Sequence, residues 1–318
     1  MEKDRWQSLW ERCHGSVYQS WDWAESNKVS GKEPIFLTIE ENCELKAGIL
    51  CFPVKIKTPF GIKTILFAEG TPLFLEKSAG EKILEVFRTE ASRYFYGTIA
   101  PTAIDQREDI FSSYKKVCNN TLIVDLQKPE EELWKNLEKK SARWGVKTAQ
   151  GNRLQFEECK SQIELKEFYE IYEKKVLKEG FGLKTLRFLK ILLNSNLVKL
   201  FLVKKDNRII AGGIILLDWD YSILSLTAAN EEGYKSQAMS FLYWNLILFS
   251  KKADKKYFDM GGYDIEAKIG NKMYSINKYK ENFGGFIKEQ SIYATNWTYP
   301  FVRLLMKKMR FIKKLYKK

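Results

Sequence analysis

The sequence predicts an α/β fold of the α+β type, in which two domains follow one another and each is a mixed sheet flanked by helices. Three observations lead to this prediction. The 318 residues are enough for two ordinary domains. Hydrophobic residues make up 45% of the chain and aromatic residues 14%, which is enough to fill two cores. The same order of strands and helices is expected twice, although the two halves share no obvious sequence repeat.

In the first half, short runs rich in apolar residues predict strands, and longer runs with apolar residues every three to four positions predict helices. A short helix is followed by a meander of three strands, a second helix and two more strands. The expected elements are a helix at 20–28, strands at 34–41, 44–57 and 63–69, a helix at 78–95, and strands at 96–102 and 120–126.

The second half repeats this order. Its most apolar stretch, residues 211–229, is interrupted by Asp218 and Asp220, which favours buried strands over a membrane span. The expected elements are helices at 164–179 and 184–194, strands at 198–206, 208–218 and 221–229, a helix at 237–252, and strands at 255–260 and 285–295.

A linking helix is expected between the halves, at residues 128–152. Pro129 is suited to its first turn, the glutamates that follow favour the positive end of its dipole, and Gly151 is suited to its end. Helical spacing predicts an apolar stripe of Trp134, Leu137, Trp144 and Thr148 and a basic stripe of Lys139, Lys140, Arg143 and Lys147. The basic stripe is either a solvated surface or a contact for a polyanion.

These elements place a first domain at 1–150, a second at 151–295 and a final helix at 296–318 that packs back on the body. From Arg303 onward this helix has eight basic residues and no acid. Its apolar face can dock on the protein, or it can lie on an anionic membrane surface, and both hold if one face docks and the other stays cationic. The expected faces are Phe301, Leu305, Met309, Ile312 and Tyr316, and, opposite, Arg303, Lys307, Arg310, Lys314 and Lys317.

The chain carries 53 basic and 40 acidic residues, a formal net charge of +13. Such an excess attracts nucleic acid, anionic lipid headgroups or phosphorylated substrates, although a lysine-rich solvated surface is the alternative. The first ten residues mix charges of both signs and lack the apolar core of a signal peptide. We therefore expect a cytoplasmic protein, with a peripheral contact at the inner membrane face.

The reactive side chains exclude several enzyme classes. The single histidine, His14, leaves no Ser-His-Asp triad and no histidine-rich metal site, and its position near the N-terminus indicates a surface residue. The five scattered cysteines fit reduced thiols better than a disulfide framework or a zinc site. Since no phosphate-binding lysine loop or GxGxxG motif follows a strand, we expect neither nucleotide hydrolysis nor a redox cofactor, and no metal.

Two neighbouring glycine-containing stretches can carry chemistry. FDMGGYD, residues 258–264, follows a predicted buried strand, and its glycines either form a tight turn or allow close approach of a ligand. INKYKENFGG, residues 276–285, contains the run Lys278, Tyr279 and Lys280. A lysine beside a reacting carbonyl can stabilise the oxyanion of acyl transfer, whereas a lysine taken alone is more often a surface residue. An attacking amine then needs orientation and a route for its proton, but no histidine-activated serine.

The order and spacing of several motifs resemble the FemABX family of tRNA-dependent peptidoglycan aminoacyltransferases, over most of the chain. YKENFGG is similar to the family's (Phe/Tyr)-Lys-x-x-Phe-Gly-Gly signature, and DMGGYD to its Gly-Gly turn. The other motifs are QSWDWAESNK at 19–28, the linking segment at 121–152, FYEIYEKKVLKEGF at 168–181 and TAANEEGYKSQAMSFLYWNLI at 227–247.

This resemblance implies two tandem GNAT-like domains with a substrate cleft between them. It implies that Lys280 stabilises the tetrahedral intermediate as an amine attacks the aminoacyl ester, while Tyr279 and Phe283 hold the segment in place. The donor would be aminoacyl-tRNA, and the acceptor a peptidoglycan precursor that is nucleotide-linked or lipid-linked.

The candidate substrate-binding residues follow from the same comparison and from the two glycine-containing stretches. Lys28 lies near the family's first-domain lysine and is expected to contact a substrate diphosphate. Lys178 stands where relatives often carry a basic residue. Asp259, Lys278 and Tyr279 complete the set.

Departures from the family leave the substrates open. Ser275 and Asn277 stand where relatives commonly have Gly and Tyr, and the long helical-hairpin insertion of some members is absent. An acyl-CoA-dependent N-acyltransferase on the same fold is the second hypothesis, although residues 229–240 lack the glycine-rich loop that binds the CoA pyrophosphate. A non-catalytic protein that binds nucleic acid or membrane through its basic faces is the third.

Overall fold

The computed structural model describes residues 1–104, 107–180 and 182–315. The chain divides into two compact units: unit 1 holds residues 1–119 and 289–318, and unit 2 holds residues 120–288. Both crossings between units fall inside a strand, the first in β6 (Lys115–Asp125) and the second in β12 (Phe286–Ala294). This division differs from the predicted domains at 1–150 and 151–295.

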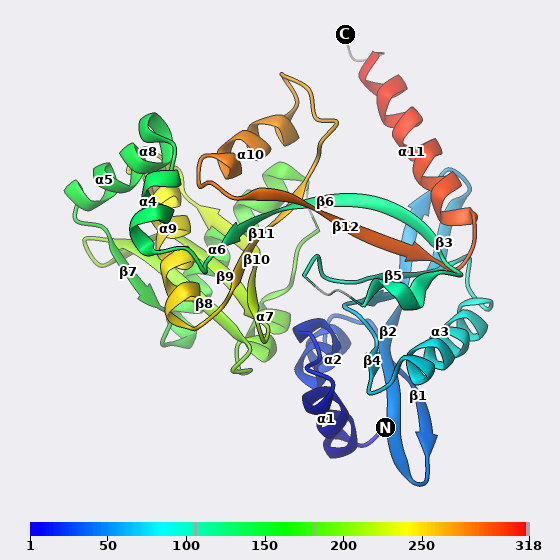
Figure 1. The fold of residues 1–318 in the computed structure, drawn as a ribbon. Helices are drawn as coiled ribbons and strands as arrows, with labels where there is room; N and C mark the ends of the chain where they lie inside the picture. The colour runs from blue at the N-terminus through cyan, green and yellow to red at the C-terminus, as the bar shows by residue number, and fades with distance from the viewer. Residues whose placement is uncertain (105–106, 181, 316–318) are drawn as a thin grey trace. The chain divides into compact units, whose positions relative to one another are not determined.

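Unit 1 is a sheet of order β1-β2-β3-β5-β12, in which only the β3–β5 pair is parallel. The helix α3 packs on β1 and β2 and closes a core that includes Ile49, Leu66 and Phe87 (Figure 1). Its elements are α1 (Lys3–Arg12), α2 (Trp21–Lys28), β1 (Ile35–Glu41), β2 (Glu44–Thr58), β3 (Gly61–Glu69), β4 (Leu73–Phe74), α3 (Lys77–Ala91), β5 (Gly97–Ala100), β12 and α11 (Thr298–Leu315).

The helix α1 was not predicted. It buries Trp6, Leu9 and Trp10, and both indole N–H groups donate to backbone carbonyls of the segment that follows, at 2.8 Å. Ser20 then caps α2 by accepting a hydrogen bond from the amide of Trp23. His14 is exposed to solvent just after α1, as predicted.

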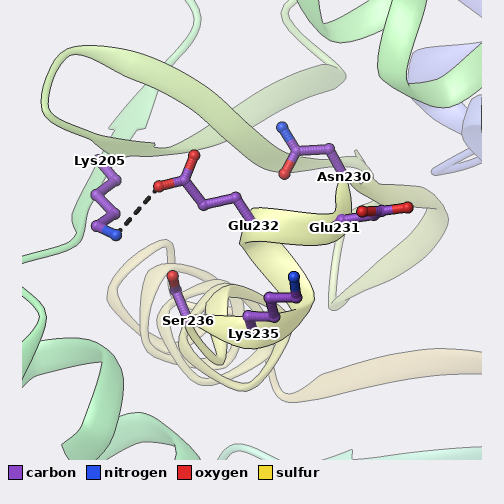
Figure 2. A pocket seen from close by; sticks show the side chains of 6 residues that line it. All are labelled: Lys205, Asn230, Glu231, Glu232, Lys235 and Ser236. Carbon is purple, nitrogen blue, oxygen red and sulfur yellow. Dashed lines mark hydrogen bonds and ion pairs between the residues drawn. The ribbon is translucent and has the colours of Figure 1, made fainter.

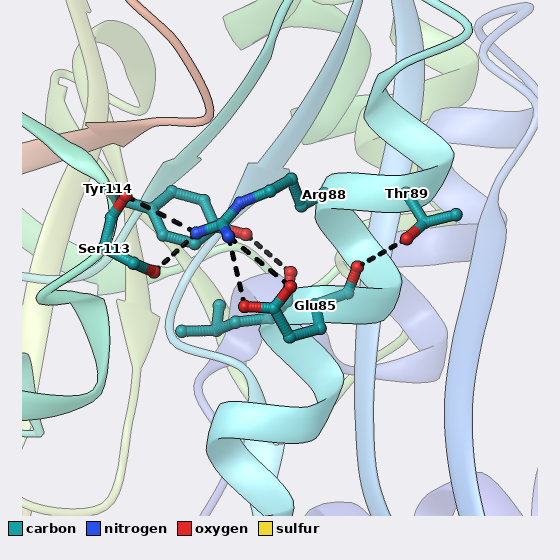
Figure 3. Close-up of polar contacts among 6 residues, drawn as sticks. Glu85, Arg88, Thr89, Ser113 and Tyr114 are labelled. Carbon is teal, nitrogen blue, oxygen red and sulfur yellow. Dashed lines mark hydrogen bonds and ion pairs between the residues drawn. The ribbon is translucent and has the colours of Figure 1, made fainter.

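A polar contact closes α3 against the segment before β6 (Figure 3). Arg88 pairs with Glu85, donates to Ser113, and lies 4.9 Å over the ring of Tyr114. The buried Tyr114 hydroxyl donates to the carbonyl of Leu84 at 2.7 Å, and burial raises the pKa of this tyrosine. The hydroxyl therefore satisfies a carbonyl that water does not reach.

Tyr114→Phe should lower the free energy of unfolding of unit 1 by about 0.5–1.5 kcal/mol, because the buried hydrogen bond from Tyr114 to the Leu84 carbonyl would be lost. Urea unfolding followed by circular dichroism measures this loss. Tyr257→Phe is the control, since its hydroxyl accepts only an exposed 3.4 Å contact from Gln127, and its change should stay within about 0.5 kcal/mol. Equal losses for the two variants would contradict the structural role of Tyr114.

Unit 2 is a sheet of order β7-β8-β9-β10-β11-β6, in which only the β10–β11 pair is parallel. Its elements are β6, α4 (Glu130–Asn136), α5 (Trp144–Gly151), β7 (Gln155–Glu158), α6 (Gln162–Glu179), α7 (Leu186–Leu192), β8 (Val198–Lys205), β9 (Arg208–Leu217), β10 (Tyr221–Ala229), α8 (Glu231–Lys235), α9 (Ala238–Lys252), β11 (Tyr257–Tyr263) and α10 (Lys272–Glu281).

The glycine pair of β9 shows how helices cover both faces of this sheet. A Cβ on Gly212 would lie 2.8 Å from the ring of Phe168 on α6, and one on Gly213 would lie 3.3 Å from Leu242 on α9. Because successive residues of a strand point to opposite faces, α6 and α9 lie on opposite sides of β9 (Figure 1). The pair therefore allows close packing of helices on both faces of β9.

Two strands pair outside the halves in which the sequence places them. The strand predicted at 120–126 becomes part of β6 and pairs with β11 in unit 2. The strand predicted at 285–295 becomes β12 and pairs with β5 in unit 1. The predicted strands follow one another in the expected order, but the two units are not contiguous in sequence.

The predicted continuous helix at 128–152 is wrong. Leu137 and Glu138 are extended, with ψ of 135° and 126°, and separate α4 from a short π-helical turn that leads into α5. Arg143 stabilises this break by donating to the carbonyls of Lys135 and Leu137, at 2.8 and 2.9 Å. The predicted apolar stripe is therefore divided: Leu137 is buried, whereas Trp144 is 53% exposed.

The helix α11 forms as predicted, but it presents a different face to unit 1. Val302 is buried and Arg303 donates to Asn119 at 2.7 Å, whereas Phe301, expected on the docking face, is 54% exposed. Tyr316 and Lys317 of the predicted faces lie outside the described residues. Across the described residues, each helix is too short or too polar to cross a bilayer.

Candidate active site

The site is built around Lys280 on α10. Asn271 caps this helix by accepting from the amide of Met273. The buried side chain of Asn277 joins α10 to the end of β11, because its amide group donates to the carbonyl of Asp264 at 2.7 Å. The residue that departs from the family pattern at 277 is thus a structural link that sets the position of Lys280.

A bulge in β11 forms the part of the site that faces Lys280. Pairing with β6 advances from Asp259 to Gly262 on β11 while it advances by only two residues on β6. The bulge therefore contains one extra residue on β11. Gly261 lies within it, and its φ of +80° is readily accessible only to glycine. Parallel pairing with β10 also ends at Asp259. Beyond Asp259, β11 no longer pairs with β10, and the carbonyls of Gly261 and Gly262 accept from a side chain instead.

Lys280 uses those carbonyls. Its Nζ donates to the carbonyl oxygens of Gly261 and Gly262, at 2.9 and 2.8 Å, and the residue is 8% exposed. Burial lowers the pKa of Lys280 to about 8, although the nearby Asp259 carboxylate opposes this shift. Burial thus distinguishes Lys280 from an ordinary surface lysine, and its catalytic role stays a prediction.

Asp259 is the buried partner of this lysine and is 3% exposed. Its carboxylate accepts hydrogen bonds from the Thr121 hydroxyl and, at 2.7 Å, from the amide of Gly261. Burial raises the pKa of Asp259, while these donors and the charge of Lys280 act in the other direction. Asp259 thus stabilises the bulge and influences the charge of Lys280.

Behind the lysine, an aromatic cluster holds α10 in position. Tyr279, Phe283 and Tyr243 of α9 lie with their ring centroids 5.2–5.4 Å apart. Burial raises the pKa of Tyr279, so its hydroxyl stays neutral. These contacts pack Tyr279 and Phe283 against α9, while their functional roles stay predictions.

The Gly284-Gly285 pair returns the chain from α10 into β12. Gly285 has φ of +99°, and a Cβ there would lie 2.4 Å from the carbonyl oxygen of Ile123. A hollow of about 390 Å³ lies beside this turn, between α4 and the ends of the strands. Its lining includes Asp125, Lys128 and Asn136.

The other predicted substrate-binding lysines lie on the surface. Lys278 is exposed and pairs with Glu281 at 2.6 Å, and Lys178 is exposed near the end of α6. Lys28 is exposed in the last turn of α2, in unit 1. In the described part of unit 2, Asp259 and Lys280 come together, and Tyr279 precedes Lys280 on α10 with its ring packed behind it. The roles of all the predicted site residues stay predictions.

Sequence reasoning missed Lys175, which lies one helical turn before Lys178. Its Nζ donates to the carbonyl of Thr227 on β10 at 2.9 Å, and burial lowers its pKa. Helical spacing from the buried residues Phe168 and Tyr172 would have placed Lys175 at the edge of the buried face. Thr121, whose partner Asp259 is 138 positions away, carries no such local signal.

No protein-family model and no curated protein sequence matches the chain. Solved structures do. The chain is similar to a structure of FemX, with a TM-score of 0.72 and 14% identity, over 96% of this chain and 98% of that one. It is also similar to L-PGS from Bacillus licheniformis, with a TM-score of 0.65 and 13% identity, over 97% and 96% of the two chains.

A third similar structure is the C-terminal domain of a putative lysylphosphatidylglycerol synthetase from Agrobacterium fabrum, with a TM-score of 0.62 and 12% identity, over 92% and 91%. At these identities the comparison concerns fold. It covers nearly the whole of each chain. The chain therefore has the FemABX-like, mixed α/β fold that its sequence motifs predicted.

Proposed function

We propose that this protein is an acyltransferase-type enzyme that moves an aminoacyl group from aminoacyl-tRNA to an amine of a peptidoglycan precursor. The observation that carries the proposal is the buried ammonium of Lys280, held by two backbone carbonyls at a strand bulge, within a signature and a fold of FemABX type. The substrates are inferred from the family resemblance, and the chemical role of Lys280 is inferred from its geometry.

The geometry suits oxyanion stabilisation. An ammonium group has three N–H donors, and two of them are directed at Gly261 and Gly262. The direction of the third is therefore set before substrate binds, which is the preorganisation that stabilises developing charge. As the acceptor amine attacks the ester carbonyl, the negative oxygen accepts from Lys280. Collapse forms the amide, breaks the ester C–O bond, and transfers a proton from the amine to the ribose oxygen that leaves.

The turn after β10 favours tRNA over acyl-CoA as the donor (Figure 2). Two of its amides are already used: that of Gly233 donates to the Asn230 side chain at 2.8 Å, and that of Ser236 donates to the carbonyl of Glu232 at 2.8 Å. The adjoining hollow is lined by Glu231 and Glu232 as well as by Lys205 and Lys235, and Lys205 pairs with Glu232 at 3.1 Å, so its acids offset the charge of its lysines. A CoA pyrophosphate needs free amides and no nearby acid.

An exposed basic and aromatic surface of unit 2 fits a polynucleotide donor. It consists of Lys139, Lys140 and Lys147, with Trp144 53% exposed among them. Lysines neutralise phosphates, and an exposed indole offers a face on which a base stacks. The break in the linking helix therefore leaves an aromatic side chain beside basic residues.

A paired transfer assay tests the proposal. One arm offers a mixture of radiolabelled aminoacyl-tRNAs with nucleotide-linked or lipid-linked peptidoglycan precursor, and the other offers labelled acetyl-CoA with the same acceptors. Transfer of label from tRNA alone would support the proposal, and the labelled amino acid would identify the group that is transferred. Label that moves from acetyl-CoA assigns the enzyme to the acyl-CoA class, and silence in both arms from folded protein favours a non-catalytic binding protein.

The pH dependence follows from Lys280. Because only the ammonium form stabilises the oxyanion, this contribution is present below a pH of about 8 and is lost as the pH rises through that value. The kcat/KM of transfer should therefore fall on the alkaline side with a one-proton limb near pH 8. Asp259 raises the pKa of Lys280, so Asp259→Asn should move this limb to lower pH. A limb that stays in place in folded Asp259→Asn protein would show that it belongs to another group.

A further inference from the structure

The outer face of α11 is apolar where it leaves unit 1. Trp297 precedes the helix and is 69% exposed, and Phe301 and Leu304 are 54% and 52% exposed. Their spacing of four and three residues puts them along one side of a helix, away from the buried Val302. Single exposed apolar residues are ordinary, but a continuous stripe that includes tryptophan indicates a binding surface.

A second apolar element lies in the same unit, at the turn between β2 and β3. Phe60 and Ile62 are 54% and 67% exposed there. A chain of contacts joins this hairpin to the start of α11: Lys63 lies over the ring of Phe95, Phe95 contacts Tyr96, and Tyr96 contacts Tyr299. The hairpin tip and the helix stripe are therefore connected parts of unit 1, called here the α11 surface.

The α11 surface is surrounded by basic residues. The ammonium of Lys115 lies 4.8 Å over the ring of Trp297, Lys307 is exposed on α11, and Lys55 and Lys57 are exposed on β2 before the turn. Residues 303–318 carry eight basic residues and no acid, and residues 55–63 carry three lysines and no acid. Cations that flank exposed aromatic and aliphatic side chains complement a surface that is anionic outside and apolar beneath.

We propose that the α11 surface binds an anionic lipid bilayer, with Trp297, Phe301, Leu304 and the tip of the β2–β3 hairpin inserted at the interface. No described helix is suited to cross a bilayer, so α11 would lie in the interfacial plane. Each nearby lysine or arginine adds attraction to anionic headgroups. Trp, Phe and Leu on one side of a helix with basic residues around them are the composition of an interfacial membrane helix, which favours lipid over tRNA as the occupant. The proposal concerns binding and stands independently of the transfer reaction.

Vesicle sedimentation with the full chain tests this proposal. Vesicles of phosphatidylcholine alone are compared with vesicles that also contain phosphatidylglycerol, at low and high salt. We expect binding to the anionic vesicles only, and weakening of that binding as salt rises. Phe301→Ser with Leu304→Ser should reduce partition to anionic vesicles at least tenfold.

The matched control is Ile163→Ser with Leu177→Ser, which changes two side chains of α6 in unit 2 that are 72% and 69% exposed. This variant should partition like the parent chain. Unfolding midpoints of both variants verify that each is folded. Equal partition of the two variants, or equal binding to neutral vesicles, would overturn the proposal. A gel-shift assay with tRNA and the same proteins tests whether the surface binds nucleic acid instead. Loss of tRNA binding in the Phe301→Ser, Leu304→Ser variant, with its vesicle binding intact, would assign the α11 surface to nucleic acid.

Discussion

Lys280→Ala is expected to lower the kcat/KM of aminoacyl transfer by about 10²–10³-fold, equivalent to roughly 3–4 kcal/mol, the loss typical of one preorganised oxyanion donor. The physical reason is that the third N–H of the ammonium is aimed by its two bonds to the carbonyls of Gly261 and Gly262. Lys280→Met should show the same loss, because it keeps an unbranched side chain in the buried position and removes only the charge and its donors.

Initial-rate assays with aminoacyl-tRNA and precursor measure this effect. Lys252→Ala, at the exposed end of α9, is the control for loss of a surface charge and should retain the parent rate. Unfolding midpoints of the Lys280 variants should fall below the parent value, because Asp259 and two carbonyls lose their buried partner, so rates are compared per folded molecule. A folded Lys280→Met enzyme with a rate within twofold of the parent would refute the catalytic role.

Gly285→Ala is expected to destabilise unit 2 by about 2–6 kcal/mol. Two causes add: strain of a non-glycine residue at φ of +99°, about 1–3 kcal/mol, and overlap of the new Cβ with the carbonyl oxygen of Ile123, about 1–3 kcal/mol. The neighbouring atom is backbone within a paired strand, so it cannot move aside cheaply. Urea unfolding measures the loss, and transfer activity per folded molecule should fall as well, because the turn follows directly after α10.

Gly151→Ala is the matched control for this prediction. Gly151 ends α5, has no positive φ, and has no atom within 4 Å of the position of a new Cβ. Its substitution should leave stability unchanged or raise it by up to about 1 kcal/mol, because alanine favours helix. If Gly285→Ala were as stable as Gly151→Ala, the backbone of the signature turn would have a different conformation from the one described.

Local patterns predicted most of the secondary structure. The meanders at 34–69 and 198–229 and the helices at 78–95 and 237–252 all form at nearly the expected positions. These elements depend on apolar periodicity and on end signals such as Ser20, which act over a few residues. The helix α1 was missed because its few buried residues, two of them tryptophans, lie in a segment dominated by charges.

Those local patterns did not predict how the strands pair. The segments 120–126 and 285–295 are equally good strands for either half, and apolar pattern alone does not select a partner among several sheet edges. Only the assembled sheet places β6 beside β11 and β12 beside β5. Helical spacing also failed to predict the break at Leu137. The hydrogen bond from Arg143 that stabilises the break forms only when the backbone there is extended.

For the site, the sequence by itself determined the identity of the central lysine. YKENFGG singles out Lys280 and its two glycines, and the order of the motifs indicates the fold. Only the tertiary structure decided that Lys280 is buried with a lowered pKa, that Lys175 reaches β10, and that Lys178 and Lys278 stay in solvent. The reason is physical: residue type follows from the sequence, whereas burial, and with it the energy of a charge, depends on neighbours that folding brings from distant positions.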